Sequence, residues 1–202
     1  MGAIDGLSHL SQVEAVYIGY FGRAGDYPGA AYWTAAMNSG FTLSQTGASF
    51  FVQLETIGLY KFAADYNANP NGPFTSDEIV AFITSIYQQA FNRPPDSAGL
   101  AYWETYLITH IAQGPAVVGA FIVAVLNGAV DVPGGTQDKT TLLNKITVAT
   151  DWTGRTNTAG LNTVTANYRA AAVNCISVVT NVPASIASGE AVTTHYINVG
   201  PH

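Results

Sequence analysis

The stretch that decides the fold is Ile86–Trp103, IYQQAFNRPPDSAGLAYW, because it repeats an earlier stretch of the same chain without a gap. That earlier stretch is Val16–Trp33, VYIGYFGRAGDYPGAAYW, which lies 70 residues upstream and is identical at eight of eighteen positions. The identical pairs are Tyr17/Tyr87, Phe21/Phe91, Arg23/Arg93, Asp26/Asp96, Gly29/Gly99, Ala31/Ala101, Tyr32/Tyr102 and Trp33/Trp103. Weaker matches at the same offset extend to Gly58 and Gly128, so the first 130 or so residues are two copies of one unit.

Each copy has the pattern of three helices. Apolar residues spaced by three and four predict a first helix that ends at Gly22 or Asn92. The second helix carries the Tyr-Trp pair, and the third ends at Gly58 or Gly128. Strand signals are weak throughout. The fold class we expect is all-α, with two tandem three-helix repeat units followed by a helical C-terminal segment.

The expected domain boundaries follow from the repeat and from a linker. The first repeat covers residues 1–66, the second covers 67–132 with its preceding Asn-rich loop, and the C-terminal segment covers 133–202. The linker is Val132-Pro-Gly-Gly135, a turn-forming sequence. Beyond it, helical patterns recur at 139–150, 159–179 and 183–196, and the segment is expected to pack on the repeats or to extend from them.

The repeated motif supports a structural, a glycan-binding or a catalytic interpretation. In the structural one, Asp caps the second helix, Arg pairs with it, and Gly allows close helix packing; the corner residues are Arg23, Asp26, Gly29, Arg93, Asp96 and Gly99. In the glycan-binding one, aromatic faces and acidic acceptors hold sugar rings; the candidates are Tyr32, Trp33, Tyr102, Trp103, Asp26 and Asp96. Two copies that keep one pattern favour the structural interpretation, since an active site is rarely needed twice.

The loop between the copies resembles a calcium-binding loop. Set against the twelve-residue EF-hand pattern, the ligand positions are filled by Asn67, Asn69, Asn71, the Pro73 carbonyl, Thr75 and Glu78. Asn replaces the usual Asp at the first position, so only Glu78 is a charged ligand. The alternative is that Thr75-x-x-Glu78 is a capping box for the next helix and that the asparagines form a turn. No cofactor is expected to be required, and calcium is the one candidate ion.

The composition excludes several classes of protein. Charged residues are only 10% of the chain and the formal charge is −6, so a nucleic-acid reader that depends on phosphate contacts is excluded. The single Cys175 and four scattered histidines suggest neither a disulfide framework nor a zinc site. No cleavable N-terminal signal is expected, and the most apolar run, residues 116–130, is too short for a membrane span.

The repeated Tyr…Arg-x-x-Asp-x-x-Gly-x-Ala-Tyr-Trp pattern resembles the domain of unknown function 4214 family, over roughly residues 8–130. The second copy is the closer match; in the first, Gly25 and Tyr27 replace the usual Pro and small residue. The resemblance implies that the chain belongs to a large secreted protein of Gram-negative bacteria, of the kind that includes S-layer and RTX-type proteins exported by type I secretion. It also implies a distant similarity to the helical linker domains of phycobilisomes.

These observations favour a non-catalytic anchoring module of an extracellular, S-layer-like bacterial surface protein. Its expected partners are cell-surface polysaccharide or lipopolysaccharide and neighbouring copies of itself, in a homo-oligomer or lattice, because few charges remain to keep copies apart. One alternative is a polysaccharide-active enzyme, favoured if Asp26, Asp96 and Glu104 line one cleft with Tyr32 or Trp103. Another is an intracellular helical scaffold.

Overall fold

The computed structural model describes residues 2–200, and in them the fold is all-α, as the sequence predicts. The helices are α1 His9–Phe21, α2 Tyr27–Asn38, α3 Leu43–Phe51, α4 Leu54–Leu59, α5 Lys61–Ala68, α6 Ser76–Phe91, α7 Ser97–His110, the 3-10 turn η1 Ile111–Gln113, α8 Ala116–Asn127, α9 Asp138–Thr158, α10 Ala166–Ser177 and α11 Ala184–Val199. Within residues 2–200, the only β-structure is one isolated bridge, between Asp131 and Gln137.

The equivalent helices α1 and α6 end in the same way. The residue after each helix has left-handed backbone angles, with φ of 60° at Gly22 and 61° at Asn92. Glycine adopts this conformation without steric cost, and asparagine tolerates it better than most other residues. The two copies therefore turn at the same place, toward the helix that carries Tyr-Trp.

The third helix of the first copy is shorter than the sequence predicts. It ends at Phe51 instead of Gly58, and the separate helix α4 follows. At the break, the hydroxyl of Thr56 donates a buried hydrogen bond to the carbonyl of Phe50. The same carbonyl also accepts a hydrogen bond of 3.2 Å from the backbone N–H of Gln53, so it remains satisfied where the helix is interrupted. In the second copy the equivalent helix, α8, is uninterrupted. The expected boundary at residue 66 falls inside α5.

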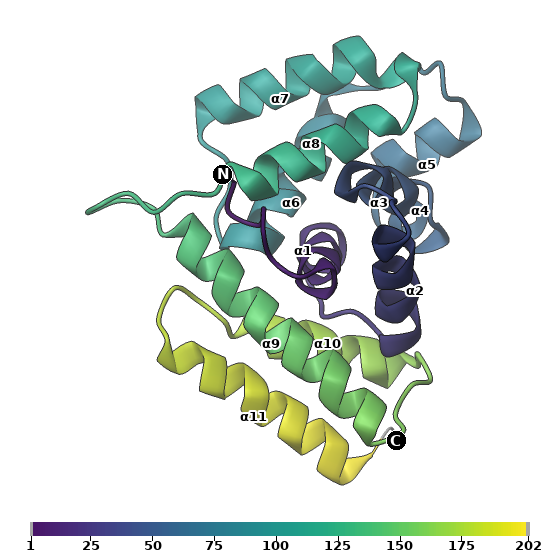
Figure 1. Cartoon of the computed structure of the whole chain (residues 1–202). Coiled ribbons are helices and arrows are strands. Elements are labelled where there is room, and N and C mark those ends of the chain that lie inside the picture. Colours follow the sequence, from purple (N-terminus) through teal and green to yellow (C-terminus); the bar gives the residue numbers. More distant parts are fainter. Residues whose placement is uncertain (1, 201–202) are drawn as a thin grey trace.

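Helix α1 lies at the centre of the molecule, with the other repeat helices and the C-terminal segment around it (Figure 1). Every residue from Val13 to Phe21 is buried. Equivalent helices of the two copies pack on each other, α1 on α6 and α3 on α8. The α3–α8 crossing is close because glycines meet there: a Cβ added at Gly119 would lie 2.2 Å from the Ser44 carbonyl oxygen.

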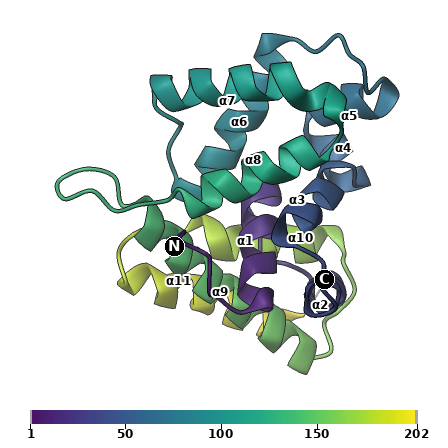
Figure 2. The same ribbon diagram turned by 45° about the horizontal axis from the view of Figure 1, so that its top comes forward.

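The C-terminal segment forms a second layer of three helices, α9, α10 and α11, beneath the repeats (Figures 1 and 2). Helix α9 packs against α1, α2 and α6 of the repeats. Within the second layer, the rings of Trp152 (α9), Tyr168 (α10) and Tyr196 (α11) pack together. The helix expected at 139–150 continues to Thr158, and the one expected from 159 begins only at Ala166, after the capping hydroxyl of Thr165.

Between α8 and α9 the chain makes a narrow turn that projects from the molecule (Figure 2). Within residues 2–200, no helix combines the length and the apolar character that crossing a membrane requires.

Candidate functional site

The repeated Asp caps its helix in both copies. Asp26 accepts a hydrogen bond of 2.9 Å from the backbone N–H of Gly29, and Asp96 accepts one of 2.8 Å from Gly99. This hydrogen bond holds the pKa of Asp96 below its ordinary value, so the carboxylate is ionised at neutral pH. The two motifs therefore share the helix start that the sequence predicts.

The repeated Arg pairs with a carboxylate that the motif does not contain. Arg23 forms a two-pronged ion pair with Glu55 of α4, at 2.9 Å for both hydrogen bonds, and its distance to Asp26 is 3.6 Å. Arg93 forms the same pair with Asp138, the first residue of α9, at 2.8 and 2.6 Å. Arg23 also donates to the carbonyl of Ala24 and lies over the ring of Tyr17. In the same way, Arg93 donates to the carbonyl of Pro94 and lies over the ring of Tyr87.

The glycine of the motif has a steric role in the first copy only. A Cβ at Gly29 would lie 2.2 Å from the hydroxyl oxygen of Tyr17, so a larger residue there would have to displace the Tyr17 side chain. At Gly99 the nearest atom would be 3.4 Å away, an ordinary contact. The first corner is therefore tightly packed, and the second is looser.

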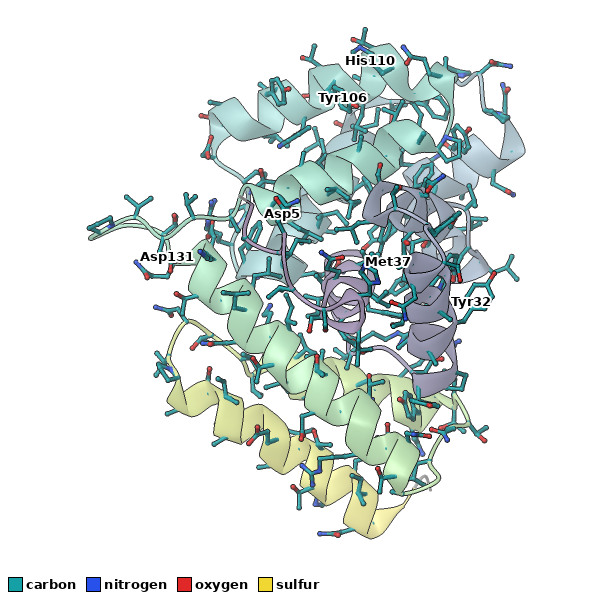
Figure 3. The ribbon with its side chains drawn as sticks, viewed as in Figure 1. Asp5, Tyr32, Met37, Tyr106, His110 and Asp131 are labelled. Carbon is teal, nitrogen blue, oxygen red and sulfur yellow. The ribbon has the colours of Figure 1, made fainter. Side chains whose placement is uncertain are left out.

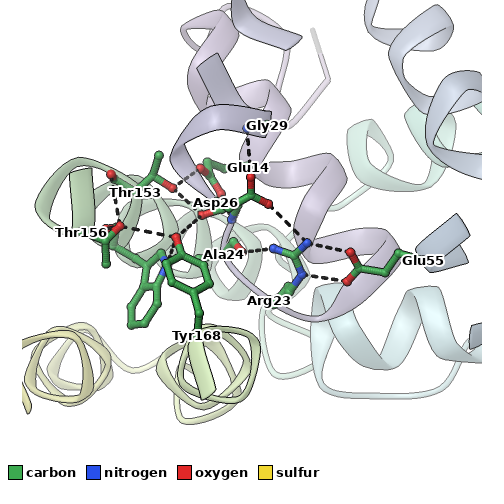
Figure 4. Close-up of polar contacts among 11 residues, drawn as sticks. Glu14, Arg23, Ala24, Asp26, Gly29, Glu55, Thr153, Thr156 and Tyr168 are labelled. Carbon is green, nitrogen blue, oxygen red and sulfur yellow. Dashed lines mark hydrogen bonds and ion pairs between the residues drawn. The ribbon is translucent and has the colours of Figure 1, made fainter. Parts of the chain in front are cut away.

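The first corner is closed by the C-terminal segment (Figure 4). Arg23 is only 3% exposed, and Glu14 is fully buried beside it. Glu14 accepts a hydrogen bond of 2.8 Å from the backbone N–H of Gly25, and its other oxygen lies 2.6 Å from the Thr153 hydroxyl of α9. Thr153 in turn donates to the Gly25 carbonyl at 3.0 Å. This network joins α1, the corner loop and α9 in the interior of the protein.

Burial raises the pKa of Glu14 from 4.5 to about 7, because a carboxylate loses its hydration inside the protein. Hydrogen bonds from Thr153 and Gly25 and the charge of Arg23 act in the opposite direction, while the charge of Asp26 adds to the increase. Glu14 therefore changes its protonation near neutral pH.

The second corner is open and forms a pocket of about 400 Å³. Tyr87, Arg93, Asp96, Trp103 and Asp138 line it together. The remaining wall comes from the end of α8 and from the projecting turn, with Val130, Val132 and Thr136. An aromatic wall with a few convergent polar groups, in a pocket of roughly 300–1000 Å³, is typical of small-ligand sites.

The structure separates the sequence-predicted sugar candidates into different environments. Tyr32 and Tyr102 are 65% and 62% exposed, and Tyr32 points outward from α2 (Figure 3). Trp33 packs on Phe50 inside the first copy, whereas Trp103 both packs on Phe121 and reaches the pocket. Asp26 and Glu104 do not line this pocket, so it does not bring together the acidic set expected of the enzyme alternative.

Sequence reasoning missed Glu55, Asp138 and Glu14. The Arg partners lie 32 and 45 residues from their arginines, beyond the reach of any local pattern. Glu14 interrupts the apolar run Val13–Ile18, and a lone acid in such a run was the signal that could have found it.

The Asn-rich loop has contacts of its own that involve the expected calcium ligands. Asn67 lies inside α5 and Asn69 accepts from the backbone N–H of Asn71, which makes a turn. Glu78 accepts from the backbone N–H of Thr75 at 2.6 Å, as in a capping box, and lies 3.2 Å from Lys61 Nζ. To coordinate an ion, Glu78 would have to leave these partners, so the calcium site stays a prediction.

At about 10 mM calcium we expect the melting temperature to rise by about 4 °C, because a charge-poor site with a Kd near 1 mM gains roughly 1.4 kcal/mol. The rise should be lost in Glu78→Gln and kept in Asp77→Asn, which removes the adjacent charge from a non-ligand position. A melting temperature that ignores calcium, or an equal rise in Glu78→Gln, rules the site out.

Comparison with known proteins gives a family for part of the chain. No curated protein and no solved structure matches it. The model of the family described as domain of unknown function (DUF4214) matches residues 61–124, which span α5 to α8 and contain Arg93, Asp96 and Trp103 of the second corner. Residues 61–124 are therefore similar to the family that the repeated motif resembles.

Proposed function

We propose that this chain is a non-catalytic module of a bacterial cell-surface protein and that it binds surface glycan in the second-corner pocket. The observation that carries the proposal is the difference between the two corners. One motif is buried under α4 and α9, whereas its copy leaves Tyr87, Arg93, Asp96 and Trp103 around a pocket.

The chemistry of the pocket suits a sugar. The Trp103 and Tyr87 rings offer apolar surface to the C–H face of a pyranose. The ionised Asp96 keeps one oxygen free of the helix cap, and that oxygen can accept from a sugar hydroxyl. Arg93 has its charge balanced by Asp138, so the pocket does not select for an anionic polymer.

The cell-surface setting and packing between copies rest on the family resemblance and on the charge-poor composition. With charged residues at 10% of the chain, neighbouring molecules repel one another little. We therefore expect the chain to associate at high concentration as well as to bind lipopolysaccharide.

Asp96→Asn is expected to weaken the binding of polysaccharide purified from lipopolysaccharide about tenfold. This corresponds to a loss of roughly 1.4 kcal/mol, because one charge-assisted hydrogen bond is weakened. Asn is as good a helix cap as Asp, so the fold should be kept. The measurement is isothermal titration against the polysaccharide, and the matched control is Asp26→Asn, the same change in the closed corner, which should leave affinity unchanged.

Equal losses in the two variants would show that the pocket is not the binding site. A chain that stays monomeric and ignores the polysaccharide would overturn the proposal as a whole. Release of sugar fragments by the unchanged chain but not by Asp96→Asn would favour the polysaccharide-active enzyme instead.

A further inference from the structure

A second pocket, of about 300 Å³, lies where the ends of α1 and α6 meet α9 and α10. Its lining includes the last residues of α1 and α6, an apolar wall from α10, and Lys145 of α9. None of the residues that line it also lines the second-corner pocket, so its chemistry is independent of the glycan proposal. The feature that sets it apart is the lysine.

Lys145 is 2% exposed, which is unusual for a charged side chain. Its Nζ donates to two oxygens, the backbone carbonyl of Gln89 and Oδ1 of Asn92, the latter at 2.6 Å. The Asn92 amide is oriented by its own donation to the Val179 carbonyl at 2.8 Å, so the oxygen faces the lysine. Both acceptors are neutral groups.

Among residues 2–200, no ion pair includes Lys145. A protonated lysine has three N–H donors and calls for an anion, whereas a neutral amine has two N–H donors and one lone pair. Two neutral acceptors therefore match the neutral amine. With both N–H groups held, its lone pair is left without a hydrogen-bond donor.

Burial acts in the same direction and lowers the pKa of Lys145 from 10.5 to about 8. No other titratable side chain lines the pocket: the ends of α1 and α6 contribute Phe21, Gly22, Gln88, Gln89 and Asn92, and α10 contributes Val173, Ile176 and Ser177. The amine form is thus far more abundant here than at Lys61, whose pKa is raised by hydrogen bonds from its ammonium to Asp65 and Glu78.

We propose that Lys145 is a nucleophilic amine that condenses with small aldehydes entering this pocket. Its Nζ lone pair attacks the carbonyl carbon, a C–N bond forms, and the oxygen leaves as water after taking up the two protons of the amine. The product is a neutral imine. Phe21, Val173 and Ile176 offer apolar contacts to a short alkyl group on the aldehyde.

The test is competitive labelling with butyraldehyde and cyanoborohydride at pH 7.5, which traps each imine as a stable amine for mass spectrometry. The chain has only three lysines, so the exposed Lys61 and Lys139 are internal references. Lys145 is expected to react at least about tenfold faster than either, because each unit by which burial lowers the pKa of Lys145 raises its own amine fraction about tenfold. Unfolding cannot produce this result, since the references are exposed in every state.

Two variants locate the reaction in the pocket. Val173→Trp should fill the entrance and slow labelling of Lys145 alone. Gln88→Glu should supply a carboxylate that keeps the lysine protonated and also slow it, whereas Gln113→Glu, the same change on the exposed turn η1, should not. If Lys145 reacts no faster than Lys61 and Lys139, or if both pocket variants leave its rate unchanged, the proposal is wrong and the lysine only joins α9 to the end of α6.

Discussion

At pH 8, the free energy of unfolding of the Glu14→Gln protein is expected to exceed that of the unchanged chain by about 3 kcal/mol. The folded-state pKa of Glu14 is about 7, above its ordinary value of 4.5. The protonated carboxyl therefore stabilises the fold fully below pH 4.5, and this contribution is lost as the pH rises through 7. Glutamine does not ionise, so the Glu14→Gln protein should not show this loss of stability between pH 4.5 and pH 8.

Glutamine also fits the hydrogen bonds of the protonated acid. In that state one oxygen of Glu14 accepts from the Gly25 N–H, and the other carries the proton and donates to the Thr153 hydroxyl, which itself donates to the Gly25 carbonyl. A glutamine side chain can place its oxygen and its NH₂ group at the same two positions. The substitution therefore changes the charge and leaves the network intact.

The measurement is urea unfolding of both proteins from pH 4 to pH 9. The two curves should nearly meet at pH 4–5 and separate progressively up to pH 8. Glu104→Gln, which neutralises a carboxylate hydrogen-bonded to Ser76 near the surface, should follow the unchanged chain. Parallel curves for Glu14→Gln and the unchanged chain would show that the buried carboxyl does not titrate in this range.

The sequence predicts most of the fold because its strongest signals are local. Helix caps such as Asp26, Asp96 and Thr75 depend on three or four consecutive residues, and the repeat shows that the same corner is built twice. These features place α1, α2, α6 and α7 to within a few residues.

The remaining features depend on contacts that no local pattern contains. Periodicity assumes that a helix has an exposed face, but α1 is buried on all sides from Val13 to Phe21, so periodicity alone assigns the acid at position 14 to the surface. The same holds for Lys145 in α9, a polar-looking helix that packs against the repeats. The difference between the closed and the open corner is a tertiary property too, since it depends on where Glu55 and Asp138 come to lie.

The crossing of α3 and α8 decides how the two copies fit together, and Gly119 is its most sensitive position. A Cβ there would lie 2.2 Å from the Ser44 carbonyl oxygen and 2.7 Å from the Ala48 nitrogen. Both are backbone atoms of α3, so the clash cannot be relieved by rotating a side chain. Gly119→Ala is expected to lower the free energy of unfolding by roughly 3 kcal/mol and the melting temperature by about 9 °C.

A graded set of glycine substitutions separates this clash from the general effect of adding a methyl group to a helix. At Gly47, on the other side of the crossing, the nearest atom would be 3.2 Å away, so Gly47→Ala should cost less than Gly119→Ala. At Gly154 in α9 a Cβ would meet nothing within 4 Å, and Gly154→Ala should raise the stability by about 0.5–1 kcal/mol through helix propensity. Calorimetric melting of the three variants gives the order. If Gly119→Ala melts no lower than Gly154→Ala, the two copies do not cross at these glycines, because no arrangement of backbone that close could accept the methyl group.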